Sequence, residues 1–200
     1  MSRPAYPPPE PGTIRSTPGP WDLNMIAAHG PITAAEQWFV AEHAVTGRAG
    51  RTAVEVGCGT GRFAHWLHHA HGYHVTGLDL SPHNLRLARV RGQGTGLSYA
   101  AHDAETGPPP GLPVDGVDLV VARMTTRYLC DPERLLRQVR DRWLRPGGSL
   151  YLQVLARPFP GELQGWAIPE NLPAYMDGWA GRQRMDEGAR AHLVLRTSPR

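Results

Sequence analysis

Three glycines at alternate positions directly after a short β-rich run constrain the fold of this chain more than any other feature. Residues 53–56 form the run, and Gly57, Gly59 and Gly61 follow it before a helical pattern begins. Glycine adopts backbone angles closed to other residues and lets a ligand approach the main chain. The first N–H groups of the following helix have no partner within the helix and point into the same turn. The segment therefore predicts a strand–turn–helix unit that binds an anionic group of a nucleotide-like ligand.

Acidic residues near this unit narrow the choice of ligand. Asp79 ends the next β-rich run, at the spacing at which an acid holds ribose hydroxyls in dinucleotide-binding folds. A carboxylate suits a vicinal diol because its two oxygens accept both O–H donors. The glycines and Asp79 alone would also fit NAD. Glu55, two residues before the first glycine, would repel a pyrophosphate but attract an ammonium group, and a third acid, Asp103, follows another β-rich run.

Five sequence blocks resemble those of the class I S-adenosylmethionine-dependent methyltransferases of the small methyltransferase-domain type. In chain order they read E-V-G-C-G-T-G, V-T-G-L-D-L-S, H-D-A, V-D-L-V-V-A-R-M-T and L-R-P-G-G-S-L-Y-L, within residues 38–154. The resemblance implies S-adenosylmethionine as the cofactor, with its methionine end at the glycine loop and its ammonium near Glu55. By the same resemblance, Asp79 would hold the ribose and Asp103 the adenine amino group. The implied cofactor-binding residues are Glu55, Gly57, Cys58, Gly59, Gly61, Asp79, Leu80, Asp103, Ala104 and Arg123.

Alternation of strand and helix patterns predicts an α/β fold. Strands are predicted at Thr52–Val56, His74–Asp79, Leu97–Ala100, Val117–Ala122 and Ser149–Leu155, with helices between them. This order is typical of a doubly wound, mostly parallel sheet with helices on both faces. Trp179–Met185 and Ala191–Arg196 predict a C-terminal antiparallel hairpin that turns at residues 186–188. Ligands of such sheets bind at the carboxyl ends of the strands, where the glycine loop, Asp79, Asp103 and residues 123–125 fall.

Helix signals support this division of the chain. Ser81 and Asp131 each precede a proline and are predicted to cap helices. Thr33, with Glu36 three residues later, has capping-box spacing. An apolar face is predicted for residues 38–40 of that helix. A second apolar face is predicted for Phe63, Trp66, Leu67 and Ala70.

The organisation predicted from these signals is a single domain preceded by an arm. Residues 1–20 are rich in proline and lack a pattern that could bury apolar area, so they are predicted to be disordered. Residues 21–200 form the methyltransferase domain, in which residues 21–45 are predicted to be a helical lid.

Composition and charge make several classes of function unfavourable. Lys and Arg total 21 against 18 Asp and Glu, and the charges are interspersed, which makes a nucleic-acid partner unfavourable. Two cysteines are too few for a disulfide framework, so a cytoplasmic protein is expected. No apolar stretch approaches the roughly 18 residues of a membrane span. The high content of Arg, Ala, Gly and Pro favours a GC-rich bacterial source.

Two further features suggest sites but are given structural interpretations. His65, His68 and His69 lie opposite the predicted apolar face of their helix and lack neighbouring carboxylates, so no metal site is predicted. Cys58 lies in the glycine loop, where the helix N-terminus could lower its pKa. Methyl transfer from a sulfonium needs no thiol, so Cys58 is interpreted as a small loop residue.

Arg127 and the adjacent Tyr128 are the candidate catalytic residues. They lie in T-R-Y-L-C-D-P, which resembles a family segment that often has histidine where this chain has Arg127. Arginine stays protonated and cannot act as a general base at neutral pH. Either the acceptor needs no base, or another group serves as the base, or Arg127 binds an anionic acceptor. The alternative is that Arg127 is an ordinary residue at a helix start. The predicted function is methyl transfer to a small-molecule acceptor. A non-catalytic, methyltransferase-like cofactor-binding or partner subunit and a nucleic-acid methyltransferase stay open as alternatives.

Overall fold

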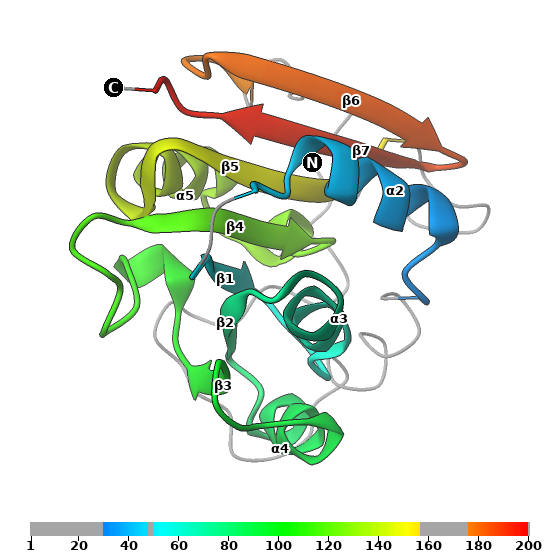
Figure 1. Ribbon diagram of the computed structural model, residues 1–200, viewed down its shortest axis with the longest axis vertical. Coiled ribbons are helices and arrows are strands. Elements are labelled where there is room, and N and C mark those ends of the chain that lie inside the picture. The colour runs from blue at the N-terminus through cyan, green and yellow to red at the C-terminus, as the bar shows by residue number, and fades with distance from the viewer. Residues whose placement is uncertain (1–29, 48–49, 157–175, 200) are drawn as a thin grey trace.

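The computed structural model describes residues 30–47, 50–156 and 176–199, and its elements are labelled as in Figure 1. In chain order they are α2 (Ala34–His43), β1 (Thr52–Val56), α3 (Arg62–His71), β2 (His74–Asp79), α4 (Pro82–Arg91), β3 (Leu97–Ala101), η1 (Ala104–Thr106), β4 (Val117–Arg123), η2 (Thr126–Tyr128), α5 (Pro132–Gln138), η3 (Val139–Trp143), β5 (Leu144–Leu155), β6 (Gly181–Glu187) and β7 (Arg190–Arg196). The predicted arm at residues 1–20 and the first part of the predicted lid lie outside the described residues. Among the helices that the structure describes, none is long and apolar enough to cross a membrane.

The strands form one seven-stranded sheet in the order β3-β2-β1-β4-β5-β7-β6, which runs from the bottom to the top of Figure 1. The first five strands are parallel, whereas β7 is antiparallel to β5 and β6 is antiparallel to β7. The predicted doubly wound sheet with a C-terminal hairpin is therefore confirmed. Strands β3 and β4 each end one residue later than predicted, and three larger details differ. β5 begins at Leu144, because Leu144 pairs with Val117 of β4 before a register shift, after which the pairing resumes between Ser149 and Leu119. The hairpin starts at Gly181 and turns at residues 188–189, where Gly188 has a φ of 61°.

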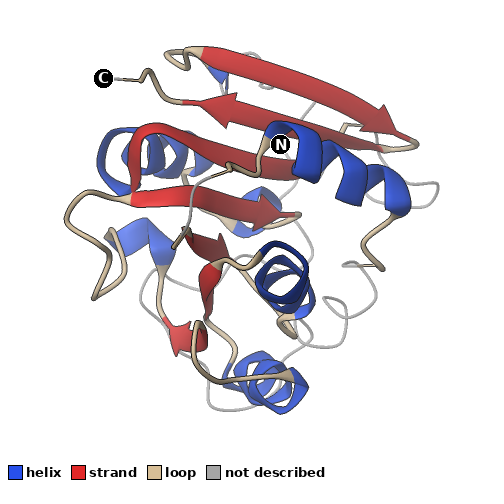
Figure 2. Cartoon of the chain, in the orientation of Figure 1, coloured by secondary structure: helices blue, strands red, loops and turns tan. Residues whose placement is uncertain are grey.

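Helices cover both faces of the sheet (Figure 2). On one face, α2, α3 and α4 bury Phe39, Phe63 and Leu85 in a single apolar cluster. On the other face, α5 and η3 pack Leu136 and Trp143 into a second cluster. Because alternate residues of a strand point to opposite faces, the buried central strands contribute to both clusters.

The predicted helix caps are confirmed. Ser81 and Asp131 accept the backbone N–H groups of Asn84 and Arg134 at 3.1 and 2.9 Å. The predicted apolar face of α3 is partly wrong, because the sheet contacts the stripe formed by Phe63, Ala64 and Leu67. Trp66 is half-buried and Ala70 is exposed.

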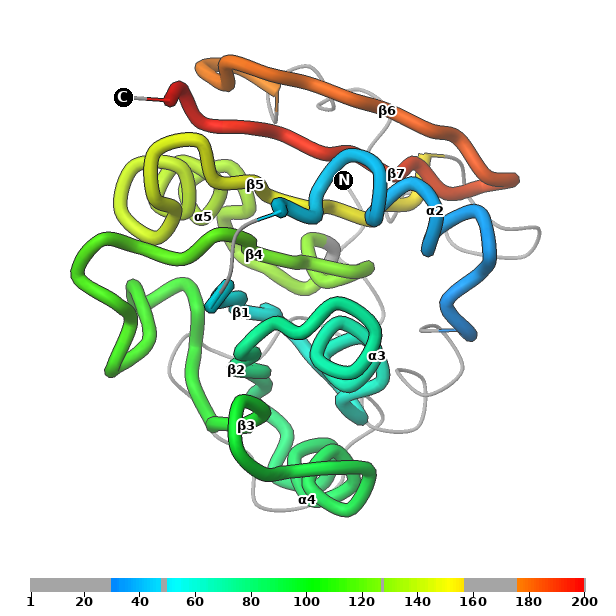
Figure 3. Tube along the Cα trace, viewed as in Figure 1, coloured from blue at the N-terminus to red at the C-terminus, as the bar shows by residue number. Residues whose placement is uncertain are grey.

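Helix α2 lies beside the C-terminal strand β7, although the two are at opposite ends of the chain (Figure 3). At its start, Thr33 caps the helix by accepting the N–H of Glu36 at 3.0 Å, and its hydroxyl donates to Glu187 of β6, also at 3.0 Å. At its end, the carbonyl oxygen of His43 accepts a bond from Arg196 at 2.6 Å. The prediction that residues 38–40 share one apolar face is wrong for Trp38, which is 60% exposed. Helix α2 is therefore tied at both ends to the hairpin.

Candidate functional site

The glycine loop after β1 depends on glycine for both its backbone and its packing. Gly57, Gly59 and Gly61 have φ values of 67°, 53° and 71°. A Cβ atom on Gly57 would lie 2.5 Å from the hydroxyl oxygen of Thr125, and one on Gly61 would lie 2.6 Å from that of Tyr99. Positive φ is unfavourable for residues with a Cβ, and here the space for a Cβ is also filled. The sequence thus places a tight turn at the carboxyl end of a central strand.

Asp79 organises this loop from the neighbouring strand β2. Its side chain is 6% exposed, and its two oxygens accept the backbone N–H groups of Gly59 and Ser81, both at 2.8 Å. The predicted contact with ribose stays a prediction. The structure adds a second task, which is to hold the loop against the end of β2.

Glu55 is buried at the end of β1 and faces the first turn of α3. Its Oε2 atom accepts the backbone N–H of Ala64 at 2.9 Å, and the residue is 3% exposed. Burial raises the pKa of Glu55 to about 8, although Arg123 opposes the shift. The sequence predicted that the turn between β1 and α3 binds an anionic group of the ligand. This prediction is corrected in part, because the carboxyl group of Glu55 already accepts one of the N–H groups in the first turn of α3.

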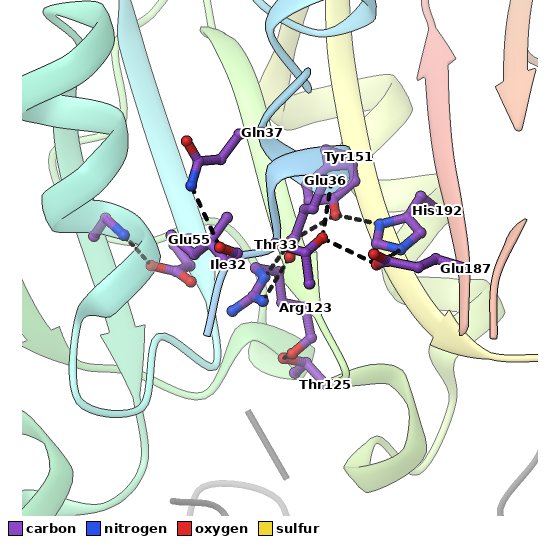
Figure 4. Close-up of polar contacts among 11 residues, drawn as sticks. Ile32, Thr33, Glu36, Gln37, Glu55, Arg123, Thr125, Tyr151, Glu187 and His192 are labelled. Atoms are coloured by element: carbon purple, nitrogen blue, oxygen red, sulfur yellow. Dashed lines mark hydrogen bonds and ion pairs between the residues drawn. The ribbon is translucent and has the colours of Figure 1, made fainter. Parts of the chain in front are cut away.

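Arg123, the last residue of β4, joins this region to α2 (Figure 4). Its Nε and Nη2 atoms donate to Oε1 and Oε2 of Glu36 at 2.6 and 2.9 Å, and the two side chains are 5% and 0% exposed. The Tyr151 hydroxyl donates to Oε1 of Glu36 at 2.7 Å and lies 2.9 Å from Nδ1 of His192. Nε2 of His192 lies 3.3 Å from Oε2 of Glu187. Polar groups from α2, β4, β5, β7 and β6 thus form one chain of contacts across the sheet.

The strand end beside Arg123 is strained. Met124 has a φ of 55°, although it is not glycine, and it is 2% exposed. Residues held in such sparsely populated conformations cluster at functional sites. The Thr125 hydroxyl then donates to the carbonyl oxygen of Val56 at 2.9 Å, which fixes the end of β4 against the glycine loop.

A cavity of about 730 Å³ lies over the glycine loop and the first turn of α3. Five of the predicted cofactor residues line it: Glu55, Gly57, Cys58, Gly59 and Arg123. It also has Gly30, Pro31, Thr60, Arg62, Phe63, Asn84, Leu87, Val90 and Arg91 in its wall. The other predicted residues, Gly61, Asp79, Leu80, Asp103 and Ala104, do not line it.

The residues after β3 lie at the same edge of the sheet as the loop but play local roles in the structure. Asp103 caps η1, and its Oδ1 accepts the N–H of Glu105 at 2.9 Å. Ala104 is buried in the core, and Leu80 is half-buried after β2. Contacts of Leu80, Asp103 and Ala104 with a cofactor stay predictions.

The candidate catalytic residues lie in η2, directly after the strained end of β4. The backbone N–H of Tyr128 donates to Thr125 at 2.9 Å, and the Tyr128 side chain is half-buried. The side chain of Arg127 lies outside what the structure describes. Both proposed roles of Arg127 therefore stay predictions.

Cys58 does not have the environment of a reactive thiol. Burial, followed by the charges of Asp79 and Glu55, raises its pKa well above the ordinary value. The idea that the helix N-terminus lowers this pKa is wrong, because the neighbouring carboxylates and the loss of water outweigh it. Within the described part of the chain, His, Cys, Asp and Glu residues form no group of three that could hold a metal ion.

Two residues of the site were missed or misassigned from sequence. Asn84 in the first turn of α4 is 1% exposed and lines the cavity, yet its Oδ1 and Nδ2 atoms have no hydrogen-bond partner among the described residues. Its place just after the Ser81 cap, at the strand-end edge, was the available signal. Glu36 was considered only as part of a capping box, whereas its side chain turns inward to Arg123. The signal for that pairing is absent from the local sequence because the partners are 87 residues apart.

Comparison with known proteins gives a consistent assignment. The family described as methyltransferase domain matches residues 54–152. A phthiotriol/phenolphthiotriol dimycocerosates methyltransferase of Mycobacterium leprae is 38% identical over 51% of this chain and 37% of its own length. A ubiquinone biosynthesis O-methyltransferase of Methylobacterium is 29% identical over 69% of this chain and 53% of its own. The chain thus spans about half or less of the length of these curated relatives.

The fold agrees with a solved structure over most of both chains. An S-adenosylmethionine-dependent methyltransferase of Mesorhizobium loti superposes with a TM-score of 0.63 at 22% identity, covering 82% of this chain and 98% of that one. The match with the family begins at Val54 and includes the glycine loop, Asp79 and Arg123. This chain therefore belongs to the class I S-adenosylmethionine-dependent methyltransferases.

Proposed function

We propose that this chain transfers a methyl group from S-adenosylmethionine to a small-molecule acceptor. The observation that carries the proposal is the gathering of the glycine loop, Glu55 and Arg123 around one cavity at the carboxyl ends of β1 and β4. Its volume of about 730 Å³ lies within the range of roughly 300–1,000 Å³ that is usual for ligand sites. Asn84 also lines the cavity, and its buried carboxamide has no hydrogen-bond partner among the described residues, although buried polar groups normally have one.

The donor set suits the cofactor of this family. Glu55 would accept the ammonium group, the glycine loop would allow close approach of the ligand to the main chain, and Asp79 would hold the ribose hydroxyls. Asn84 can both donate and accept, so it would complete the polar wall. When bound, the cofactor supplies a methyl group that its sulfonium already activates.

The task of the protein is then mainly alignment and exclusion of water. Holding two reactants at near-attack distance lowers the barrier without any proton transfer. The strained end of β4 fixes Arg123 and Thr125 beside the glycine loop, and α2 bounds the region toward the hairpin. These rigid contacts favour a mechanism in which the acceptor meets the methyl group in a preformed site.

The two curated relatives favour a small acceptor. One is named for phthiotriol and phenolphthiotriol dimycocerosates and the other for ubiquinone biosynthesis. We extend this to the present chain as a small molecule of unspecified skeleton. An anionic group on the acceptor remains a prediction from Arg127.

Calorimetry followed by an acceptor screen tests the proposal. S-Adenosylhomocysteine should bind, and NAD should not. A screen of small molecules with methyl-labelled S-adenosylmethionine should then reveal a labelled product. Binding of NAD without binding of S-adenosylhomocysteine would contradict the cofactor assignment. Tight cofactor binding without turnover would instead favour a non-catalytic subunit, and labelling of RNA would favour a nucleic-acid methyltransferase.

A further inference from the structure

The buried pair of Glu36 and Arg123 lies at the wall of the cavity rather than in the centre of the core. Arg123 lines the cavity together with Glu55, and Glu36 comes from α2, which does not line it. We propose that Glu36 is a positioning residue that holds Arg123 toward the carboxylate of the cofactor's amino-acid tail, so that α2 forms part of the cofactor site. This inference rests on the proposed function, since it assumes that the cavity binds S-adenosylmethionine.

The geometry leaves Arg123 able to bind a second anion. A guanidinium carries five N–H donors in a rigid fork, and Glu36 receives bonds from Nε and Nη2 only. The Cζ atom of Arg123 lies 5.2 Å from the ring centroid of Phe63, which also lines the cavity. Glu36 and the Phe63 ring therefore fix the plane of the guanidinium, and the remaining donors can meet a ligand carboxylate.

The charges around the cavity match an amino-acid zwitterion. Burial lowers the pKa of Arg123, but the hydrogen bonds and negative charge of Glu36 outweigh it and raise that pKa overall, so Arg123 stays a cation. Glu55 lies in the same wall and can accept an ammonium group. One wall thus offers an anion partner and a cation partner to the two charged groups of a single amino-acid tail.

The contacts behind Glu36 keep its carboxylate in place. Tyr151 donates to Oε1 at 2.7 Å, and the Tyr151 hydroxyl lies 2.9 Å from His192. Buried ion pairs contribute little net stability, because desolvation offsets most of the attraction. A pair that served only the core could be replaced by apolar side chains, whereas a pair that orients a binding group could not.

Decarboxylated S-adenosylmethionine provides a direct test, because it keeps the sulfonium and the ammonium but lacks the carboxylate. By calorimetry, the wild-type chain should bind S-adenosylmethionine at least about tenfold more tightly than the decarboxylated compound. Glu36→Gln keeps the shape and one acceptor but removes the charge that orients Arg123. We expect this variant to lose most of the preference, to below about threefold, mainly by weaker binding of the intact cofactor.

Two further variants make the outcome decisive. Arg123→Lys keeps the charge but lacks the fork, so it should lose the same preference, and it serves if Glu36→Gln does not fold. Glu187→Gln lies at the far end of the polar chain, and it should keep the wild-type preference. A preference that survives in Glu36→Gln and Arg123→Lys, or that is absent from the wild type, overturns the inference. Failure of the wild type to bind either compound would instead refute the proposed function.

Discussion

The glycine loop (residues 57–61) and the α2–hairpin region, defined by the polar contacts among Thr33, Glu36, Arg123, Tyr151, Glu187 and His192, are held together by different kinds of contact. In the loop, carboxylates bond to nearby backbone N–H groups: Asp79 to Gly59, 20 residues away, and Glu55 to Ala64, nine residues away. In the α2–hairpin region, side chains bond to side chains across 87 residues in the pair of Arg123 and Glu36 and 154 residues in that of Thr33 and Glu187. The loop therefore shapes itself locally, whereas the α2–hairpin region exists only when distant elements have packed.

The largest expected effect is in the loop. Gly57→Ala places a Cβ 2.5 Å from the Thr125 hydroxyl oxygen at a φ of 67°. Positive φ and overpacking together should lower the free energy of unfolding by about 2–5 kcal/mol. Chemical denaturation measures this loss. Adding Thr125→Ala removes the clash but not the positive φ, so it should restore only part of the stability, and full restoration would show that the backbone is unstrained.

Asp79→Ala should combine a loss of stability with a loss of binding. Two backbone N–H groups lose their acceptor, which should lower the free energy of unfolding by about 2–4 kcal/mol. Affinity for S-adenosylhomocysteine should fall about tenfold or more, because the ribose also loses a partner. Denaturation and calorimetry on the same preparation separate the two effects. Unchanged affinity in a destabilised variant would show that Asp79 only shapes the loop.

Glu55 makes the stability of the loop region depend on pH. Its pKa is raised to about 8, so between its ordinary value of 4.5 and 8 the folded state binds more protons than the unfolded state. Stability should therefore fall as pH rises through this window, by up to about 1.4 kcal/mol per pH unit. Glu55→Gln should remove this term, so denaturation should show an advantage over the wild type that grows from pH 6 to 7.5. An advantage that is constant with pH would contradict the raised pKa.

Binding of S-adenosylmethionine should have the opposite dependence. An ammonium group favours the ionised form of Glu55, so binding should release a proton and strengthen as pH rises toward 8. Calorimetry in buffers with different ionisation enthalpies would detect the proton. Glu55→Gln should bind more weakly and release none.

The smallest effects compare one hydroxyl in each region. Tyr151→Phe in the α2–hairpin region removes contacts to Glu36 and His192 and should cost about 1–2 kcal/mol of unfolding free energy. Tyr99→Phe in β3 removes one long bond of 3.4 Å to Gly61 of the loop and should cost about 0.5 kcal/mol or less. Thermal or chemical denaturation measures both changes. Equal costs would mean that the side-chain network does not hold α2 more strongly than backbone contacts hold the loop.

The sequence predicted the sheet well because its signals are local. The bounds of β1 and β2, and the caps at Ser81 and Asp131, follow from patterns only a few residues long. Details that depend on neighbours were less accurate. The start of β5 is set by pairing with β4, and the buried stripe of α3 is set by the rotation of that helix on the sheet. The prediction for Trp38 was wrong because no local pattern shows which side of α2 meets the sheet, and this apolar side chain is exposed.

The sequence by itself determined the order of strands and helices, the positions of the three glycines and the acids at the strand ends. The order of the elements and the positions of the glycines follow from backbone preferences. The acids come together because the carboxyl ends of parallel strands lie at the same edge of the sheet. Only the tertiary structure decided that the Glu36 side chain pairs with Arg123, that the Asn84 carboxamide is buried without a partner among the described residues, and that burial raises the pKa values of Glu55 and Cys58. Such pairings depend on which side chains lose water together, and that is fixed when α2, the sheet and the hairpin pack.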